Sequence, residues 1–282
     1  MRAGLLPIIL ADPLPWAKRA PYAWDFLRDR ARFAGGYKGA LANTPGWSFT
    51  RASTGYAQTS AGALMSFASG ELRRTDKGVL IEGARTNVIT YSQEFDNVSK
   101  SKANVTVVAN QYVAPDGTTT ADQILASAGS AAHYVQTNIT WTNAVHTISF
   151  YARYDNHRWI AVTTWDGTTS RNASFDLLNG VVGAVTNATS IMTALSGGWY
   201  RCTVTGSTAM AAVAGNVSIG PNSTDSASSA TWNPAGTEAF GIWGLQAEAA
   251  SFPSSYIPTT TASATRAADV LTVALPTYNT NL

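Results

Sequence analysis

Four aromatic and basic side chains in the middle of the chain have the types and spacing needed to bind a sugar. Trp159 and Trp165 are six residues apart, which places both indoles on one face of an extended strand, ~20 Å apart at ~3.3 Å per residue. Tyr151 and Arg153 are predicted on the matching polar face of the preceding strand. Indole rings stack on the C–H face of a sugar while polar neighbours bond to its hydroxyl groups. The sequence therefore allows two interpretations of this face: burial against a second sheet, the N-terminal segment or another subunit, which is the favoured one, and a glycan-binding surface.

The carboxylates that are candidates for a hydrolytic pair are scattered along the chain. Glu238 and Glu248 flank a predicted strand, and Asp155, Asp166 and Asp176 fall in turns. A glycosidase needs two carboxylates about 5–9 Å apart, and the spacing of these residues brings no pair together. A nucleophile elbow, a phosphate-binding loop and a dinucleotide fingerprint are all absent from the sequence. We therefore expect a protein that is not an enzyme, with a polysaccharide-degrading enzyme as an alternative.

Metal-ligand spacing is also absent. His133, His146 and His157 are predicted at strand ends or turns, with no carboxylate or cysteine at ligand spacing. The single cysteine, Cys202, excludes an intrachain disulfide and is expected in the core. The turn at Asp116–Gly117 is the one place where calcium, which takes clustered oxygens, is considered. No other cofactor or metal is expected.

Strands must position the sugar-binding candidates. Residues 146–154 and 158–165 alternate apolar and polar side chains with the period of a half-buried strand, and residues 155–157 are predicted to turn a hairpin between them. A second hairpin is predicted at Asn179–Gly180. Strands are further predicted at 104–109, 133–140, 172–177, 181–186, 199–205, 215–220 and 238–247. Such short strands predict an all-β fold, a jelly-roll or concanavalin-like β-sandwich over residues 47–269. Residues 270–282 would be a tail or the start of a further segment.

Residues 1–46 differ from the rest in composition. They hold seven Lys/Arg and three Asp/Glu, a net charge of +4, whereas the remainder holds twelve and fourteen, a net charge of −2. Four prolines between positions 7 and 21 exclude a continuous helix there, and residues 22–33 are compatible with a short helix or a strand. We expect an irregular N-terminal arm that docks on a partner or neighbouring subunit. Its anchoring residues would be Trp16, Trp24, Phe26, Arg28, Arg30 and Arg32.

The overall composition limits the classes of partner that the chain is expected to bind. Charged residues make up only 13% of the chain, which indicates polar strand surfaces rather than long charged helices. The net charge of +2 is too small to predict a nucleic-acid partner. No apolar run approaches the ~20 residues of a membrane-spanning helix, so membrane insertion is not expected.

Several short motifs together resemble a family of bacteriophage structural proteins. They are Phe49–Ser53, Gly78–Asn87, Ala114–Asp122, Gly198–Arg201, Trp243–Glu248, Phe252–Thr259 and Arg266–Asp269. In this pattern the chain is similar to tail-fibre, baseplate or head-fibre proteins with a carbohydrate-binding-module-like jelly roll, over roughly residues 47–270. The Glu-Gly-x-Arg-Thr-Asn and Tyr-Ile-Pro-Thr…Arg-Ala-x-Asp elements are the more specific ones.

The resemblance implies a non-catalytic virion component, made in the cytoplasm of a bacterial host, that decorates the particle or adheres to host-surface glycans. A homotrimer, attached to other virion proteins through the arm, is the usual geometry of such fibres. A stand-alone carbohydrate-binding module is the first alternative. Within the motifs, we expect Glu82 to pair with Arg85 across a turn, Asn87 to bond to the backbone, and Arg266 and Asp269 to tie the closing strand to the body.

Overall fold

The structure, a computed structural model, describes residues 23–25, 30–32, 38–39 and 47–273. Regular structure in these residues is β-strand, apart from one 3-10 turn, η2 (Ser196–Gly198). The all-β prediction is therefore confirmed. No helix in this part of the chain has the length and apolar character to cross a membrane.

The described residues form two compact units. The larger, which we call the sandwich unit, comprises Ala61–Leu64 and Arg85–Thr265. The smaller unit contains Met65–Ala84 together with the described residues of 1–60 and 266–282. Sequence analysis placed one domain over residues 47–269, whereas the structure groups 47–60, 65–84 and 266–273 apart from the sandwich.

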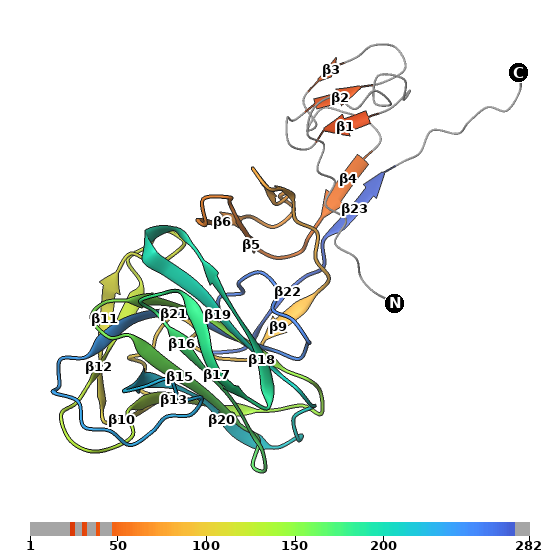
Figure 1. Cartoon of the computed structure of the whole chain (residues 1–282). Coiled ribbons are helices and arrows are strands. Elements are labelled where there is room, and N and C mark those ends of the chain that lie inside the picture. The colour runs from red at the N-terminus through yellow and green to blue at the C-terminus, as the bar shows by residue number, and fades with distance from the viewer. Residues whose placement is uncertain (1–22, 26–29, 33–37, 40–46, 274–282) are drawn as a thin grey trace, which may run out of the picture. The chain divides into compact units, whose positions relative to one another are not determined.

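The sandwich unit contains two six-stranded sheets, and every strand pair in both is antiparallel (Figure 1). One sheet, here called sheet F, has the order β10 (Ser101–Ala103), β13 (Tyr134–Thr140), β20 (Ala214–Asn222), β15 (Trp159–Trp165), β16 (Ser170–Asp176) and β17 (Val181–Thr186). The other, sheet G, has the order β11 (Val105–Tyr112), β12 (Ala121–Ala126), β21 (Ala239–Glu248), β14 (Thr147–Tyr154), β19 (Trp199–Gly206) and β18 (Ala188–Ala194). The chain crosses repeatedly between the sheets, as expected for the predicted jelly-roll sandwich.

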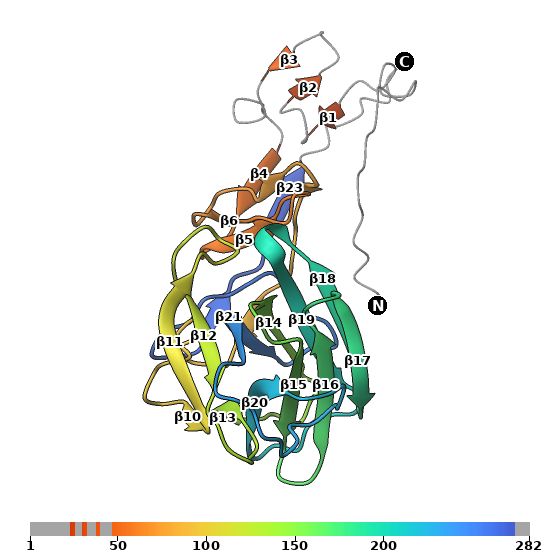
Figure 2. The ribbon, with the colours of Figure 1, turned by 60° about the vertical axis from the view of Figure 1, so that its left-hand side comes forward.

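The two sheets face each other in the second view (Figure 2). The side chains between them form one apolar core. Alternate residues of each strand point inward, for example Ile148 and Phe150 on β14 and Ile160 and Val162 on β15, all fully buried. Phe150 of sheet G meets Phe175 of sheet F edge-to-face, with ring centroids 6.0 Å apart. Burial of these alternating side chains is what holds the sheets together.

The hairpin predictions had different outcomes. β16 and β17 form the hairpin expected at Asn179–Gly180, where Asp176 Oδ1 accepts the backbone N–H groups of Leu178 and Asn179. The prediction of a hairpin at residues 155–157 is wrong, because β14 and β15 lie in opposite sheets. Alternation identified both strands correctly, but it carries no information on which neighbours complete each strand's hydrogen bonds.

Short strand pairs make up the remaining regular structure. The N-terminal sheet has the order β1 (Ala23–Asp25), β2 (Arg30–Arg32) and β3 (Lys38–Gly39), so the strand alternative holds for these parts of 22–33. The other pairs are β4 (Trp47–Thr50) with β23 (Val270–Val273), β5 (Gly55–Gln58) with β6 (Leu64–Phe67), β7 (Arg74–Thr75) with β8 (Gly78–Val79), and β9 (Arg85–Asn87) with β22 (Ala264–Arg266).

The anchoring arm cannot be traced through its side chains. Trp16, Phe26 and Arg28 lie outside the described residues. Trp24 falls in β1, and Arg30 and Arg32 fall in β2, where the backbone alone is described.

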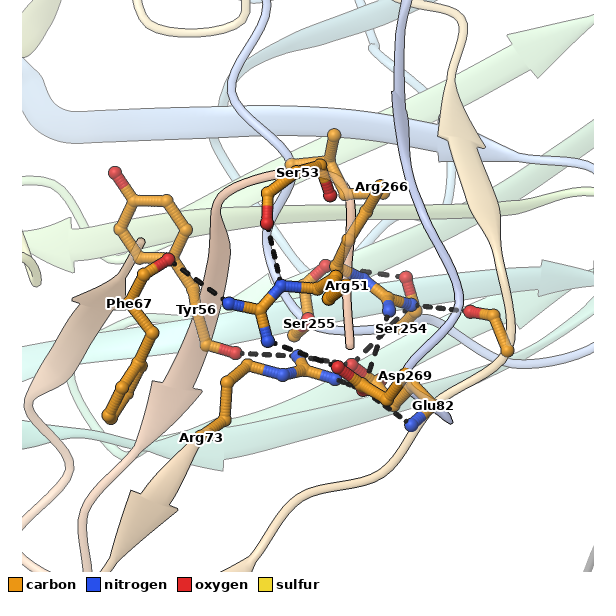
Figure 3. Close-up of polar contacts among 12 residues, drawn as sticks. Arg51, Ser53, Tyr56, Phe67, Arg73, Glu82, Ser254, Ser255, Arg266 and Asp269 are labelled. Carbon is orange, nitrogen blue, oxygen red and sulfur yellow. Dashed lines mark hydrogen bonds and ion pairs between the residues drawn. The ribbon is translucent and has the colours of Figure 1, made fainter. Parts of the chain in front are cut away.

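A buried ionic network, the arginine cluster, ties the segments of the smaller unit together (Figure 3). It consists of Arg51, Arg73, Glu82, Arg266 and Asp269. The Asp269 carboxylate contacts Arg51 at 3.1 Å, Arg266 at 3.9 Å and Arg73. The carboxylate of Glu82 lies 2.6 Å from Arg73 and 3.5 Å from Arg266. The cluster thus joins three parts of the chain that are separated in sequence, at residue 51, at residues 73–82 and at residues 266–269.

The motif predictions are settled by these contacts. As expected, Arg266 and Asp269 tie the closing segment to earlier parts of the chain, through Glu82 and through Arg51 and Arg73. The expected Glu82–Arg85 pair is wrong, because Glu82 pairs with Arg73 and Arg266. The guanidinium of Arg85 instead lies over the ring of Phe252, 5.0 Å from its centroid.

Asn87 bonds to the backbone as predicted. Its amide nitrogen donates to the carbonyls of Leu245 and Ile257, at 3.2 and 2.9 Å. Its amide oxygen accepts the N–H groups of Ile89 and Ala247, at 3.1 and 3.0 Å. A single buried side chain therefore fixes three separate chain segments.

Candidate functional site

The outward face of sheet F is polar and carries both predicted tryptophans. On β15 the outward residues alternate with core residues, so Trp159 and Trp165 share this face as expected. Trp165 lies in register with Ser170 on β16 and with Asn216 on β20, and Asn216 is in register with Asn138 on β13. This row places one indole among two amides and a hydroxyl.

An open groove with a volume of about 720 Å³ lies at the Trp165 end of this face. The indole of Trp165 is one of its walls and is 38% exposed, a high value for so large an apolar side chain. The other lining residues are Val88, Thr90, Asn138, Ile139, Thr140, Ala214, Gly215, Asn216 and Ser263. None carries a charge, so the groove presents an aromatic ring, amides, hydroxyls and aliphatic side chains.

The backbone beneath Trp165 is held by a second tryptophan. Trp141 is buried and donates its indole N–H to the carbonyl of Trp165 at 2.8 Å. Gly215 makes this approach feasible, because a Cβ atom there would lie 2.0 Å from the Trp165 carbonyl oxygen and 2.3 Å from Trp141 Nε1. The ring of Trp165 therefore projects from a fixed point.

The opposite wall is formed by the segment after β9, which includes Val88 and Thr90. The bonds of Asn87 hold the start of this segment on β21, and the N–H of Val88 donates to Ala247 at 3.0 Å. Lys100 ties the segment to β13, with its ammonium 3.2 Å from both the Thr90 carbonyl and the Thr137 hydroxyl. Burial lowers the pKa of Lys100 to about 8.

Another part of the face is contacted by the chain that follows β20. Asp225 in this segment accepts the N–H of Ala184 at 2.6 Å and a hydrogen bond from Ser174. Further along, Trp232 stacks on His157, with ring centroids 5.2 Å apart. The groove at the Trp165 end is free of these contacts.

The structure does not bring the four predicted sugar-binding residues together. Trp159 shares the face of Trp165 but lies outside the groove lining, with the guanidinium of Arg158 4.9 Å from its ring centroid. Tyr151 and Arg153 lie on β14 in the other sheet. The expected common surface is thus wrong, because it depended on the β14–β15 hairpin.

Tyr151 is buried rather than displayed. It is 1% exposed and packs against Trp243 and Tyr256, with ring centroids 5.2 and 6.0 Å away. The segment carrying Tyr256 is held on β21, where the N–H of Ile257 donates to Gln246 at 2.7 Å. For Tyr151, the burial alternative is correct.

The acidic residues considered for catalysis or metal binding accept hydrogen bonds from nearby groups and so stabilise the local structure. Glu248 is buried and accepts Ser254 N–H at 2.9 Å, and Asp166 and Asp176 hold the turns that follow them. The Asp116 carboxylate, considered for calcium, accepts the N–H and hydroxyl of Thr118 at 3.0 and 2.6 Å. Within the described part of the chain, no group of three or more His, Cys, Asp or Glu residues is arranged to hold a metal ion.

Sequence reasoning missed the polar residues of the groove. Asn138 and Thr140, which line the groove, alternate with buried residues on β13, and this period-two polar pattern was visible in the strand predicted at 133–140. The contributions of Thr90 and Ser263 come from loops, and no local pattern indicates where those loops run.

Comparisons with known proteins give fold-level similarities. A scan against protein-family models and a search of curated proteins both find no match. Among solved structures, TmCBM61 in complex with β-1,4-galactotriose has 13% identity and a TM-score of 0.36, covering 57% of this chain and 97% of that one. The CBM22-2 xylan-binding domain of Paenibacillus barcinonensis Xyn10C has 12% identity and a TM-score of 0.35, covering 57% and 98%.

A phage protein is also among the similar structures. The enzymatically active domain of bacteriophage CBA120 tailspike protein 4 has 11% identity and a TM-score of 0.31, covering 57% of this chain and 21% of that one. All three TM-scores are below 0.5, so these similarities transfer no function to this chain.

Proposed function

We propose that the sandwich unit is a non-catalytic glycan-binding module whose binding site is the groove beside Trp165. The observation that carries this proposal is the exposed indole of Trp165 within a wall of uncharged amides and hydroxyls. A sugar ring has an apolar C–H face and a rim of hydroxyl groups, and both find a matching partner here.

The chemistry of the lining favours binding over hydrolysis, and neutral over charged sugars. Hydrolysis of a glycosidic bond requires a carboxylate pair in nearly all known mechanisms. The groove lining contains no Asp, Glu, His or Cys. Because it also contains no Lys or Arg, nothing in it compensates for the charge of an acidic sugar.

Replacing Trp165 by Ala should weaken glycan binding at least about tenfold, or ~1.4 kcal/mol, because the stacking surface is lost. The measurement is titration of the chain with neutral oligosaccharides prepared from the host surface. Phe252→Ala is the matched control, since Phe252 is also exposed but lies outside the groove. Equal affinity of wild type and Trp165→Ala would remove the proposal, provided that their melting temperatures agree.

We further propose that this module belongs to a phage virion protein, a tail or baseplate fibre or a head decoration subunit. Support comes from the motifs that resemble those of that family and from the basic, aromatic composition of residues 1–46. In this role the arm anchors the chain to other virion proteins, and the groove meets glycans of the host surface.

Light scattering on the purified chain should give a mass of three chains, and removal of residues 1–46 should reduce it to one. The reason is that an arm docking on its neighbour is needed to cover the surfaces between subunits. A mass of one chain in both forms would contradict the trimer and favour a stand-alone carbohydrate-binding module.

A further inference from the structure

A second pocket lies on the outward face of sheet G, within the sandwich unit. It has a volume of about 340 Å³, at the lower end of the ~300–1,000 Å³ typical of small-molecule sites. Arg153 and Trp199, which are neighbours in register on β14 and β19, contribute to its lining. The remaining lining residues are Ala63, Leu64, Val113, Ala114, Pro115, Asp116, Gly117, Ser196 and Gly197.

The guanidinium of Arg153 is held by aromatic rings and not by a carboxylate. It lies 4.7 Å from the ring centroid of Tyr112 and 5.9 Å from that of Trp199. No described residue accepts a hydrogen bond from it, and its buried Nε–H has no partner. By contrast, Arg158 and Arg171 of the same unit each pair with an aspartate.

Two carboxylates that are candidate partners, Asp155 two residues along the chain and Asp116 in the pocket lining, are already engaged. Asp155 accepts hydrogen bonds from the Tyr112 hydroxyl at 2.6 Å and the Gln123 amide at 2.8 Å. Burial and this bond to Asp155 raise the pKa of Tyr112 to about 12, so the phenol stays neutral and gives Arg153 no counter-charge. Asp116 is engaged by Thr118.

A glycine on the strand beside Arg153 leaves space for the arginine side chain against the sheet. Gly241 on β21 is in register with Arg153, and a Cβ atom there would lie 2.5 Å from Arg153 Cγ and 3.0 Å from the Tyr112 ring. An alanine at this position would push the arginine stem off the sheet. The side chain is therefore pre-positioned, which lowers the entropic cost of binding through it.

The geometry points to a second ligand site in this pocket, which binds the carboxylate of an acidic sugar through Arg153. A guanidinium with free N–H groups matches a carboxylate in a bidentate pair. A single Arg with Asp116 also in the lining disfavours a doubly charged phosphate or sulfate. The small volume suits one or two sugar rings, with Trp199 and Val113 as apolar walls and Ser196 as a polar one.

The test is calorimetric titration of the full chain with digalacturonate and with its methyl ester, which keeps the rings and removes the charge. We expect the acid to bind at least about tenfold more tightly than the ester, as a charge-assisted bidentate pair requires. Arg153→Gln should abolish this preference, and Gly241→Ala should reduce it by displacing Arg153. Lys102→Gln, which removes an exposed cation of sheet F, should leave the preference intact and serves as the control for net charge.

Several outcomes would overturn the inference. Equal affinity for acid and ester, or an unchanged preference in Arg153→Gln, would exclude Arg153 as the anchor. Binding of triglycine with a free carboxylate but not of digalacturonate would assign the pocket to peptides instead. If Arg153→Gln fails to fold, Arg153→Lys is the substitute variant. It keeps the positive charge but lacks the planar pair of N–H donors, and it should still lose most of the preference for the acid over the ester. Trp165→Ala should leave digalacturonate binding unchanged, so this site and the groove can fail independently.

Discussion

Replacing Asp269 by Asn is expected to destabilise the smaller unit by about 3–5 kcal/mol, the usual effect of removing one partner from a buried ion pair. The side chain of Asp269 is fully buried, as are those of Arg51 and Arg73. In the variant, three clustered guanidinium groups would share the single carboxylate of Glu82, which is partly exposed. Asparagine also presents an N–H₂ group where the arginines require an acceptor.

Amide hydrogen exchange, read separately for the two units, measures this effect. Exchange should accelerate across residues 47–60, 65–84 and 266–273, while protection in 85–265 should hold. Glu71→Gln removes the same charge from an exposed side chain of the smaller unit and should change stability by less than about 0.5 kcal/mol. If Asp269→Asn exchanges like Glu71→Gln, the cluster is not what stabilises this unit.

Sequence analysis identified the strands better than their partners. Every strand predicted between residues 104 and 247 is present, because an apolar residue at every second position has to face the core. Strand order depends on crossovers between sheets, which leave no local trace. The error at residues 155–157 shows the consequence, since it placed Arg153 and Trp165 on one surface when they belong to different sheets.

Strand alternation also explains which residues of the groove could be predicted from the sequence. Trp165 was identified as a candidate because strand alternation places it on the outward face of its strand, whereas its exposure became known from the structure. Thr90 and Ser263 reach the groove through loops that Asn87 and its backbone partners hold in place. Asn87 was correctly expected to bond to the backbone, but a one-dimensional pattern does not give the identity of its partners in β21 and in the segment after it.

Asp166 should make the sandwich unit sensitive to acid, and Asp166→Asn is expected to cost about 3–5 kcal/mol at neutral pH. The carboxylate is buried and satisfied on both oxygens. Oδ1 accepts the N–H groups of Thr168 and Thr169, and Oδ2 accepts Arg171 Nη1 at 2.8 Å and Ala211 N–H at 3.1 Å. An asparagine can keep the bonds on one side only, because its N–H₂ group would face two donors on the other.

The direction in which the pKa of Asp166 is shifted determines how the stability of the sandwich unit changes with pH. Burial by itself would raise the pKa of Asp166, but the hydrogen bonds from Thr169, Ala211 and Thr168 outweigh it and hold the pKa well below the ordinary value. The stability contributed by the ionised group is therefore complete above pH ~4, the pKa of an aspartate in the unfolded chain, and is lost as the pH falls toward the lower folded value.

Denaturant unfolding of wild type and Asp166→Asn at a series of pH values tests this assignment. The difference in unfolding free energy should be constant from about pH 7 to pH 5 and should shrink below pH ~4, where the wild-type carboxylate begins to lose its advantage. Asp96→Asn removes the same charge from an exposed position and should show no such trend. A difference that stays constant down to pH 2 would mean that Asn disturbs the turn by its shape, and that the charge of Asp166 contributes nothing to stability.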